Sequence, residues 1–187
     1  MGQYYSPIFL KEDNKPFAYF ESWDFNNGSK LMEHSYIRNT FVNFVEMQLI
    51  NNPTNIVWAG DYADYEDNLE ENLYDLKDNT IGIKITHNEG EDLSHKHKFK
   101  NYLPKKYKYI LNHDKKEFVN KATVPSNDGW EIHPLPLLTC EGNGRGSGDY
   151  RGENDYIGLW SRNKISLISR KSDIPKDFKE IKPNFSE

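Results

Sequence analysis

Residues 35–59 read SYIRNTFVNFVEMQLINNPTNIVWA, and this stretch decides the fold. Its first half places apolar side chains at helical spacing, which predicts one amphipathic helix that begins at Ser29 or Ser35 and ends near Ile50. The Asn-Asn-Pro sequence at 51–53 is a typical helix stop. The apolar residues 56–59 that follow predict a short buried strand. The apolar stripe of the helix consists of Ile37, Phe41, Phe44, Val45 and Leu49.

Further strands are expected on both sides of this helix in the sequence. Aromatic and β-branched residues predict a hairpin from 4–10 and 17–23, a strand around 81–85, a second hairpin from 107–111 and 118–122, and one or two strands within 157–169. The chain holds 12 Tyr, 10 Phe and 4 Trp, and such large side chains can build a core in a chain that is polar on average. We therefore expect an α+β fold in which a mainly antiparallel, aromatic-rich sheet packs on one long helix.

The 187 residues are expected to form a single domain over 1–172, followed by a polar C-terminal tail over 173–187. The two halves of the chain share one spacing: Tyr5 lies 53 residues before Trp58, and Tyr107 lies 53 residues before Trp160. Each pair encloses a Tyr-rich strand at its start and a Trp-bearing strand at its end. An internal duplication whose two halves have diverged would explain this repeated spacing, and chance similarity between aromatic hairpins would explain it as well.

Charge and composition narrow the function classes. The 24 basic and 29 acidic residues give a net charge of −5, which argues against a general nucleic-acid coat protein but leaves binding by a local patch open. Cys140 is the single cysteine, so no intrachain disulfide, zinc ribbon or CxxC motif can form. The N-terminus lacks the basic and apolar regions of a signal peptide, and no apolar run reaches the roughly 18 residues of a membrane span. We expect a cytoplasmic protein that does not contact a membrane.

Residues 142–152 read GNGRGSGDYRG, and this loop is the most distinctive candidate site. Glycines let a backbone approach a ligand closely, successive N–H groups can surround an anion, and a guanidinium can clamp a phosphate. The loop therefore predicts binding of a small anionic ligand such as a nucleotide or signalling nucleotide. A flexible surface connection is the alternative. The predicted ligand-binding residues are Asn143, Gly144, Arg145, Gly146, Ser147, Gly148, Tyr150 and Arg151, with Lys30 for added charge and with Tyr150 or Trp58 to stack a base.

An enzyme acting on the same ligand class, a hydrolase or transferase, is the second hypothesis. Asp149, His133 and Glu33 would then be its catalytic acid–base groups. In a protein that only binds, Asp149 would instead accept a hydrogen bond from a ribose hydroxyl. His133 lies in the segment 130–138, whose two prolines predict a stiff, extended approach to the glycine-rich loop.

Two charged segments suggest macromolecular partners. Eight acidic side chains lie within 61–78, and the charge becomes basic over 95–108. The third hypothesis is that the acidic segment binds a host protein and inhibits a defence or nucleic-acid-binding complex. The basic segment carries interleaved aromatics and could bind single-stranded nucleic acid. It could also pair with the acidic segment, in the same molecule or across a homodimer. Asp61 and Asp64 would suit Mg²⁺ but lack a third ligand, so no metal site is predicted and no cofactor is indicated.

Four short motifs resemble those of an uncharacterised family of bacteriophage and bacterial proteins. These are MGQYY at 1–5, SKLME at 29–33, LNHDKKEF at 111–118 and GNGRGSGDY at 142–150. The resemblance is scattered over most of the chain, and the glycine-rich motif is its most specific part. It implies no activity, and Ser147 is glycine in some members. What it implies is a phage accessory protein that acts on host defence or metabolism, for example by sequestering a defence signal.

Overall fold

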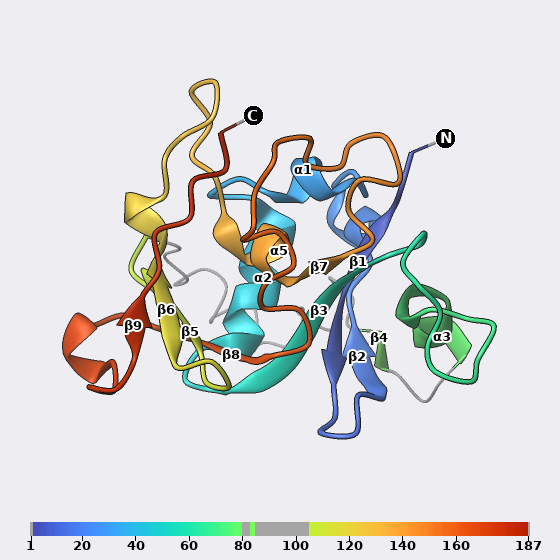
Figure 1. The fold of residues 1–187 in the computed structure, drawn as a ribbon, viewed down its shortest axis with the longest axis horizontal. Coiled ribbons are helices and arrows are strands. Elements are labelled where there is room, and N and C mark those ends of the chain that lie inside the picture. The colour runs from blue at the N-terminus through green and yellow to red at the C-terminus, as the bar shows by residue number, and fades with distance from the viewer. Residues whose placement is uncertain (1, 80–82, 85–104, 187) are drawn as a thin grey trace.

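The computed structural model describes residues 2–79, 83–84 and 105–186. It shows a mixed α/β protein with a mostly antiparallel sheet and a few short helices (Figure 1). The strands are β1 (Tyr5–Leu10), β2 (Pro16–Tyr19), β3 (Thr54–Gly60), β4 (Ile83–Lys84), β5 (Tyr109–Asn112), β6 (Glu117–Asn120), β7 (Cys140–Glu141), β8 (Lys164–Ile168) and β9 (Lys179–Glu180). The helices are α1 (Leu31–His34), α2 (Thr40–Leu49), α3 (Leu73–Asn79) and α5 (Pro134–Thr139), with 3₁₀ turns η1 (Ser22–Phe25), η3 (Lys121–Thr123) and η4 (Lys171–Asp173).

The long helix predicted from the sequence is α2, and it begins later than the apolar pattern suggests. The side chain of Asn39 accepts a hydrogen bond from the Val42 N–H (3.2 Å) and so caps the helix at Thr40. A separate short helix, α1, precedes it. Glu33 accepts a hydrogen bond from the Lys30 N–H (3.0 Å) at the start of α1. With the earlier of the two predicted starts, Ser29, the predicted helix is two helices, and the Asn39 cap begins the second.

The prediction of an extended segment at 130–138 is wrong from residue 134 onward, because Pro134–Thr139 forms α5. Both prolines lie in the first turn, where backbone N–H groups have no partner within the helix, so proline costs little there. His133 is the capping residue, and its Nδ1 accepts from the Leu135 N–H (3.2 Å). The second predicted strand is also shorter than expected, because β2 ends at Tyr19 and Trp23 lies in η1.

The pairing pattern of the sheet is the same when it is followed from either edge. The strand order is β4-β2-β1-β3-β8-β5-β6-β9, with β7 pairing off this path with β3. At one edge β4 pairs parallel with β2, which forms an antiparallel hairpin with β1, and β1 pairs antiparallel with β3. At the other edge β9 pairs parallel with β6, which forms a hairpin with β5, and β5 pairs antiparallel with β8. The centre is an antiparallel contact between β3 and β8.

The register follows the same symmetry. Phe9 pairs with Ala18 on one side and Ile56 on the other, and all three enter the main core. Ile110, Val119 and Leu167 form the corresponding set in the second half, and they enter the same core. Thr54 and Ile165, which occupy equivalent places in β3 and β8, pair with each other at the centre. By this register Trp58 and Trp160 are not equivalent, since Trp58 lies within β3 whereas Trp160 precedes β8.

An aromatic cluster joins the sheet to the helices. Its rings meet at centroid distances of 4.8–6.4 Å, and such contacts add to the stability that burial alone provides. Alternate strand residues point to the opposite face, where α3 covers β1–β3 and residues 174–178 cover β5, β6 and β8. The cluster consists of Phe9, Phe20, Phe25, Phe41, Phe44 and Trp58.

The segment expected to be a polar tail contributes to this fold. Within it, β9 extends the sheet beyond β6, and Phe185 is fully buried against Tyr150 at a centroid distance of 6.2 Å. Figure 1 shows the tail running along the outside of the sheet toward the end where both termini lie.

Candidate ligand-binding site

The glycine-rich loop does form a ring of backbone N–H groups around an anion, and the anion is its own Asp149. Oδ2 of Asp149 accepts hydrogen bonds from the N–H groups of Gly144 (2.8 Å), Arg145 (3.0 Å) and Gly146 (3.0 Å). The Asp149 side chain is buried. Charge-assisted bonds of this kind are stronger than neutral ones. The donors that the sequence assigns to a phosphate therefore have a partner within the chain.

The other polar groups of the loop also have internal partners. Asn143 closes the neck of the loop, since its side chain accepts from the Tyr150 N–H (2.8 Å) and donates to the Tyr150 carbonyl (3.1 Å). Arg151 donates to the carbonyl of Gly146. Arg145 donates to the Tyr62 carbonyl (2.9 Å) and pairs with Asp64 (2.7 Å). These contacts are those of a loop that stabilises its own conformation.

Residues 2 and 3 of the N-terminal motif pack directly against this loop. Gly2 and Ser147 form a parallel bridge, and the backbone of Gln3 lies so close to Gly146 that any Cβ there would overlap it. The Tyr5 hydroxyl donates to Oε1 of Gln3 (3.1 Å), and burial, then the nearby Asp149 carboxylate, raises the pKa of Tyr5. Two motifs almost 140 residues apart therefore form one structural unit (Figure 1).

Lys30 is a predicted charge that lies beside the loop and not within it, and its side chain is half-buried. Its Nζ donates to Oγ of Ser147 (3.3 Å). Gly148 has a φ of +83°, and its missing side chain leaves the space that the methylenes of Lys30 occupy. The sequence could not show whether Lys30 reaches the loop, and the structure brings the two together.

The aromatic and acidic candidates occupy structural positions. Trp58 is fully buried, and its indole N–H donates to Nδ1 of His34 (2.9 Å). Tyr150 is buried as well, and its hydroxyl donates to the Ser186 carbonyl (3.2 Å). Neither ring presents a face to solvent, so their predicted stacking role has no support in this structure. Glu33 is exposed but caps α1 with its carboxylate.

The hollow that Arg145 borders is acidic. It has a volume of about 400 Å³ and is lined by Asp61, Asp64 and Asp75 as well as Arg145. Burial raises the pKa of Asp61, although a hydrogen bond from the Tyr4 N–H (2.9 Å) opposes this shift. Three carboxyl groups beside one guanidinium would repel a phosphate, so this hollow does not suit an anion.

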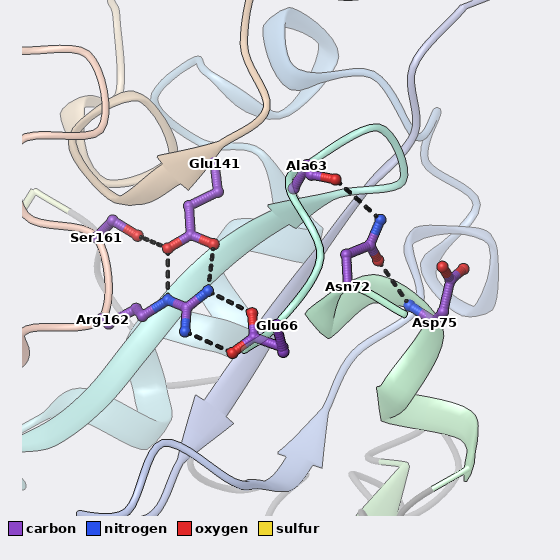
Figure 2. Close-up of polar contacts among 7 residues, drawn as sticks. All are labelled: Ala63, Glu66, Asn72, Asp75, Glu141, Ser161 and Arg162. Atoms are coloured by element: carbon purple, nitrogen blue, oxygen red, sulfur yellow. Dashed lines mark hydrogen bonds and ion pairs between the residues drawn. The ribbon is translucent and has the colours of Figure 1, made fainter. Parts of the chain in front are cut away.

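Arg162 ties Glu66 of the acidic segment 61–78 to Glu141 of β7. Its guanidinium lies between Glu66 and Glu141 and donates two hydrogen bonds to each (Figure 2), at 2.6 and 2.9 Å in both cases. Asn72 caps α3 by accepting from the Asp75 N–H (3.0 Å). Glu66 is therefore not part of a free acidic face. The exposed large apolar side chains within 61–72 are Tyr62, Tyr65 and Leu69. The protein-partner role expected for 61–78 stays a prediction.

His133, the remaining catalytic candidate, lies in a buried charged cluster with Glu46 and Lys121. Its Nε2–H donates to Oε1 of Glu46 (2.8 Å), and the Lys121 ammonium bonds to the same oxygen. Burial lowers the pKa of His133, while the neighbouring carboxylate partly opposes the shift. Burial alone would raise the pKa of Glu46, but Lys121 and His133 bring it down to about 2. The cluster therefore keeps Glu46 ionised, and burial disfavours a positive charge on the His133 imidazole.

Lys121 also lines a pocket, which we call the lysine pocket. The pocket has a volume of about 370 Å³. Lys105 and Lys108 share it, and with the residues that the structure describes Lys108 forms no ion pair. Glu131 at its rim pairs with Lys105 (3.1 Å). The apolar part of the wall consists of Ile37, Ala122, Val124 and Ile132.

Sequence reasoning missed Glu46 and Lys121 and treated the two other lysines only as part of the basic segment. Glu46 falls four residues after Val42 and three before Leu49, on the buried face of α2, so a buried carboxylate could have been predicted there. Its partner could not, because Lys121 lies 75 residues away along the chain. Residues 95–104 of the basic segment lie outside the described residues.

In the part of the chain that the structure describes, no group of three or more His, Cys, Asp or Glu side chains is arranged to hold a metal ion. No helix there is long and apolar enough to span a bilayer. Burial raises the pKa of Cys140 to about 12, which keeps its thiol protonated and unreactive.

Comparison with protein-family models, with curated proteins and with solved structures finds no match, so the function has to be argued from the site itself.

Proposed function

We propose that this protein binds a small anionic ligand, such as a phosphorylated metabolite, in the lysine pocket. The observation that carries the proposal is that three lysines, Lys105, Lys108 and Lys121, line one pocket, and that Lys121 is almost entirely buried (4 % of the side chain exposed). Three lysines at the wall of one pocket attract an anion more strongly than a single solvated surface lysine does.

The charge balance around the pocket favours an anion over a cation. Glu131 at the rim is shared between Lys105 (3.1 Å) and Arg38 (3.9 Å), so it does not neutralise both. Glu46 lies behind Lys121 and is fully buried. Its carboxylate is not exposed to a ligand, but it pairs with Lys121 and offsets that charge, so Lys105 and Lys108 supply the net positive charge of the pocket.

The same cluster favours a binding protein over an enzyme. A general acid or base needs a nitrogen or oxygen within hydrogen-bond reach of the substrate. Nδ1 of His133 accepts from Leu135, and Nε2 donates to Glu46. Both ring nitrogens are therefore occupied, and the side chain is fully buried. In the phage setting that the sequence resemblance implies, a protein of this kind would sequester a small signalling molecule.

Titration calorimetry with inorganic pyrophosphate tests the proposal. Replacing Lys108 with alanine removes an exposed charge from the pocket, so we expect the dissociation constant to rise about tenfold, corresponding to about 1.4 kcal/mol. Lys121 is a poorer probe, because its loss would strand the buried Glu46 charge and cost about 3–5 kcal/mol of stability.

The matched control for this titration is Lys115→Ala, at the opposite end of the β5–β6 hairpin, where the side chain is equally exposed. It should leave pyrophosphate affinity within a factor of about two, since a distant surface charge is screened. Equal weakening by both substitutions would mean that only net charge matters, and the site proposal would fail.

We also propose that the chain consists of two degenerate halves. The support is the matching order of β4-β2-β1-β3 and β9-β6-β5-β8, together with the register in which Phe9 and Ile110 occupy equivalent places. In an experimental structure, a two-fold rotation through the Thr54–Ile165 pair should superpose β1–β3 on β5, β6 and β8. A relation other than a two-fold rotation would contradict it.

A further inference from the structure

A second hollow adjoins the lysine pocket and has a different character. It has a volume of about 410 Å³, and Ile132 lines both hollows. Its wall carries the aromatic rings of Tyr36 and Trp130 and the polar side chains of Asn127 and Asp128. Large aromatic surface next to hydrogen-bonding groups is typical of sites that bind a planar, polar ring.

The backbone explains why the two hollows lie side by side. Tyr36 bridges antiparallel to Ile132, and the N–H of Ile37 donates to the carbonyl of Glu131 (2.7 Å). Ile37 and Glu131 line the lysine pocket, while their chain neighbours Tyr36 and Trp130 line the second hollow. A ligand lying across the paired residues 36–37 and 131–132 would contact both hollows.

Trp130 is held in place although it is exposed. The backbone N–H of Trp130 donates to the carbonyl of Asn127 (2.8 Å), and the backbone N–H of Asn127 donates to the carbonyl of Trp130 (3.1 Å). Asp128 and Gly129 between them have φ values of +46° and +83°, as in the tight turns that Asp-Gly favours. The ring contacts Tyr36 at a centroid distance of 5.9 Å, while 65 % of the residue stays exposed. A fixed, accessible indole can stack with a base at little entropic cost.

We propose that the ligand is a nucleotide whose phosphates bind in the lysine pocket and whose base stacks against Trp130 in the adjoining hollow. This inference rests on the proposed function, since it assigns the anion of the lysine pocket to a nucleotide. Asn127 and Asp128 supply an amide and a carboxylate for the edge of the base. The glycine-rich loop takes no part in the contact.

The test compares inorganic pyrophosphate with the diphosphates of adenosine, guanosine, cytidine and uridine by titration calorimetry. We expect at least one nucleoside diphosphate to bind about tenfold more tightly than pyrophosphate, because stacking on one aromatic ring adds that much. Trp130→Ala should abolish this preference and leave pyrophosphate affinity unchanged. Trp23→Ala, which removes an exposed tryptophan elsewhere (52 % exposed), should change neither.

The outcomes separate the two proposals. If pyrophosphate binds but no nucleoside diphosphate binds more tightly, or if Trp130→Ala keeps the preference, the nucleotide inference is overturned and the anion site stands. If neither pyrophosphate nor any nucleotide binds, both are overturned. Because Trp130 is largely exposed, its replacement should leave the circular dichroism spectrum unchanged, so a loss of preference cannot be ascribed to unfolding.

Discussion

At the scale of single residues, two buried histidines show how polar groups are accommodated in an aromatic core. His34 accepts from the Trp58 indole through Nδ1 and bonds to the Gly28 carbonyl (2.8 Å) through Nε2, so both ring nitrogens are satisfied in the neutral form. Burial lowers the pKa of His34 to about 4. His133 is neutral for the same reason. Both could be mistaken for catalytic groups in the sequence, and both serve the structure.

The lowered pKa of His34 makes the free energy of unfolding depend on pH. The unfolded chain takes up a proton at His34 near pH 6.5, whereas the folded chain resists protonation until about pH 4. The free energy of unfolding should therefore fall as the pH drops through this window, by about 3 kcal/mol from His34 alone. Urea denaturation at pH 7.5 and 4.5 measures the change.

The variant His34→Gln keeps one donor and one acceptor but cannot titrate, so it should show a weaker pH dependence than the wild type. His133 titrates with the same sign, so part of the dependence should remain. An identical pH dependence in His34→Gln would contradict the assigned role.

At the scale of elements, the periodic spacing of apolar residues predicted most helices and strands. The residue types in the proline-containing and glycine-rich segments did not predict the conformation of those segments. The apolar stripe gave α2, and the aromatic runs gave β1, β3 and the β5–β6 hairpin. The two prolines led to the prediction of an extended segment. Proline is tolerated in the first turn of a helix, however, and α5 contains both there. The glycine-rich loop was expected to enclose an anion. Nothing in its sequence could show that Asp149, three residues after Gly146, folds back to be that anion.

Because the Asp149 carboxylate holds the glycine-rich loop together, its removal should destabilise the fold. Asp149→Ala leaves three backbone N–H groups without their acceptor, so it should lower the free energy of unfolding by about 3 kcal/mol. Asp149→Asn keeps an acceptor oxygen and should cost less. Asp155→Ala, at an exposed site just beyond the loop, should cost almost nothing.

Chemical denaturation measures these three variants, and pyrophosphate titration should show unchanged affinity in all of them. A folded, stable Asp149→Ala protein that has lost pyrophosphate binding would contradict the structural role given to the loop.

At the scale of the whole molecule, the two proposed binding features lie where the second half of the chain meets residues 32–37 of the first. The glycine-rich loop joins the two halves at another place. Lys105, Lys108 and Lys121 flank the β5–β6 hairpin, whereas Glu46, which holds Lys121, comes from α2. The loop 142–152 packs on the N-terminal strand. Such long-range pairings carry no local sequence signal, which is why the site residues could be predicted only in part.

The most direct test maps pyrophosphate binding onto the backbone by nitrogen-15 NMR. The account predicts that the amide signals that shift during the titration belong to residues around the lysine pocket, among them Lys108, Lys121 and Ile132. The amides of Gly144, Arg145 and Gly146 should stay in place, because Asp149 already holds them. Shifts concentrated on those three amides, with the lysine pocket unaffected, would contradict the central claim.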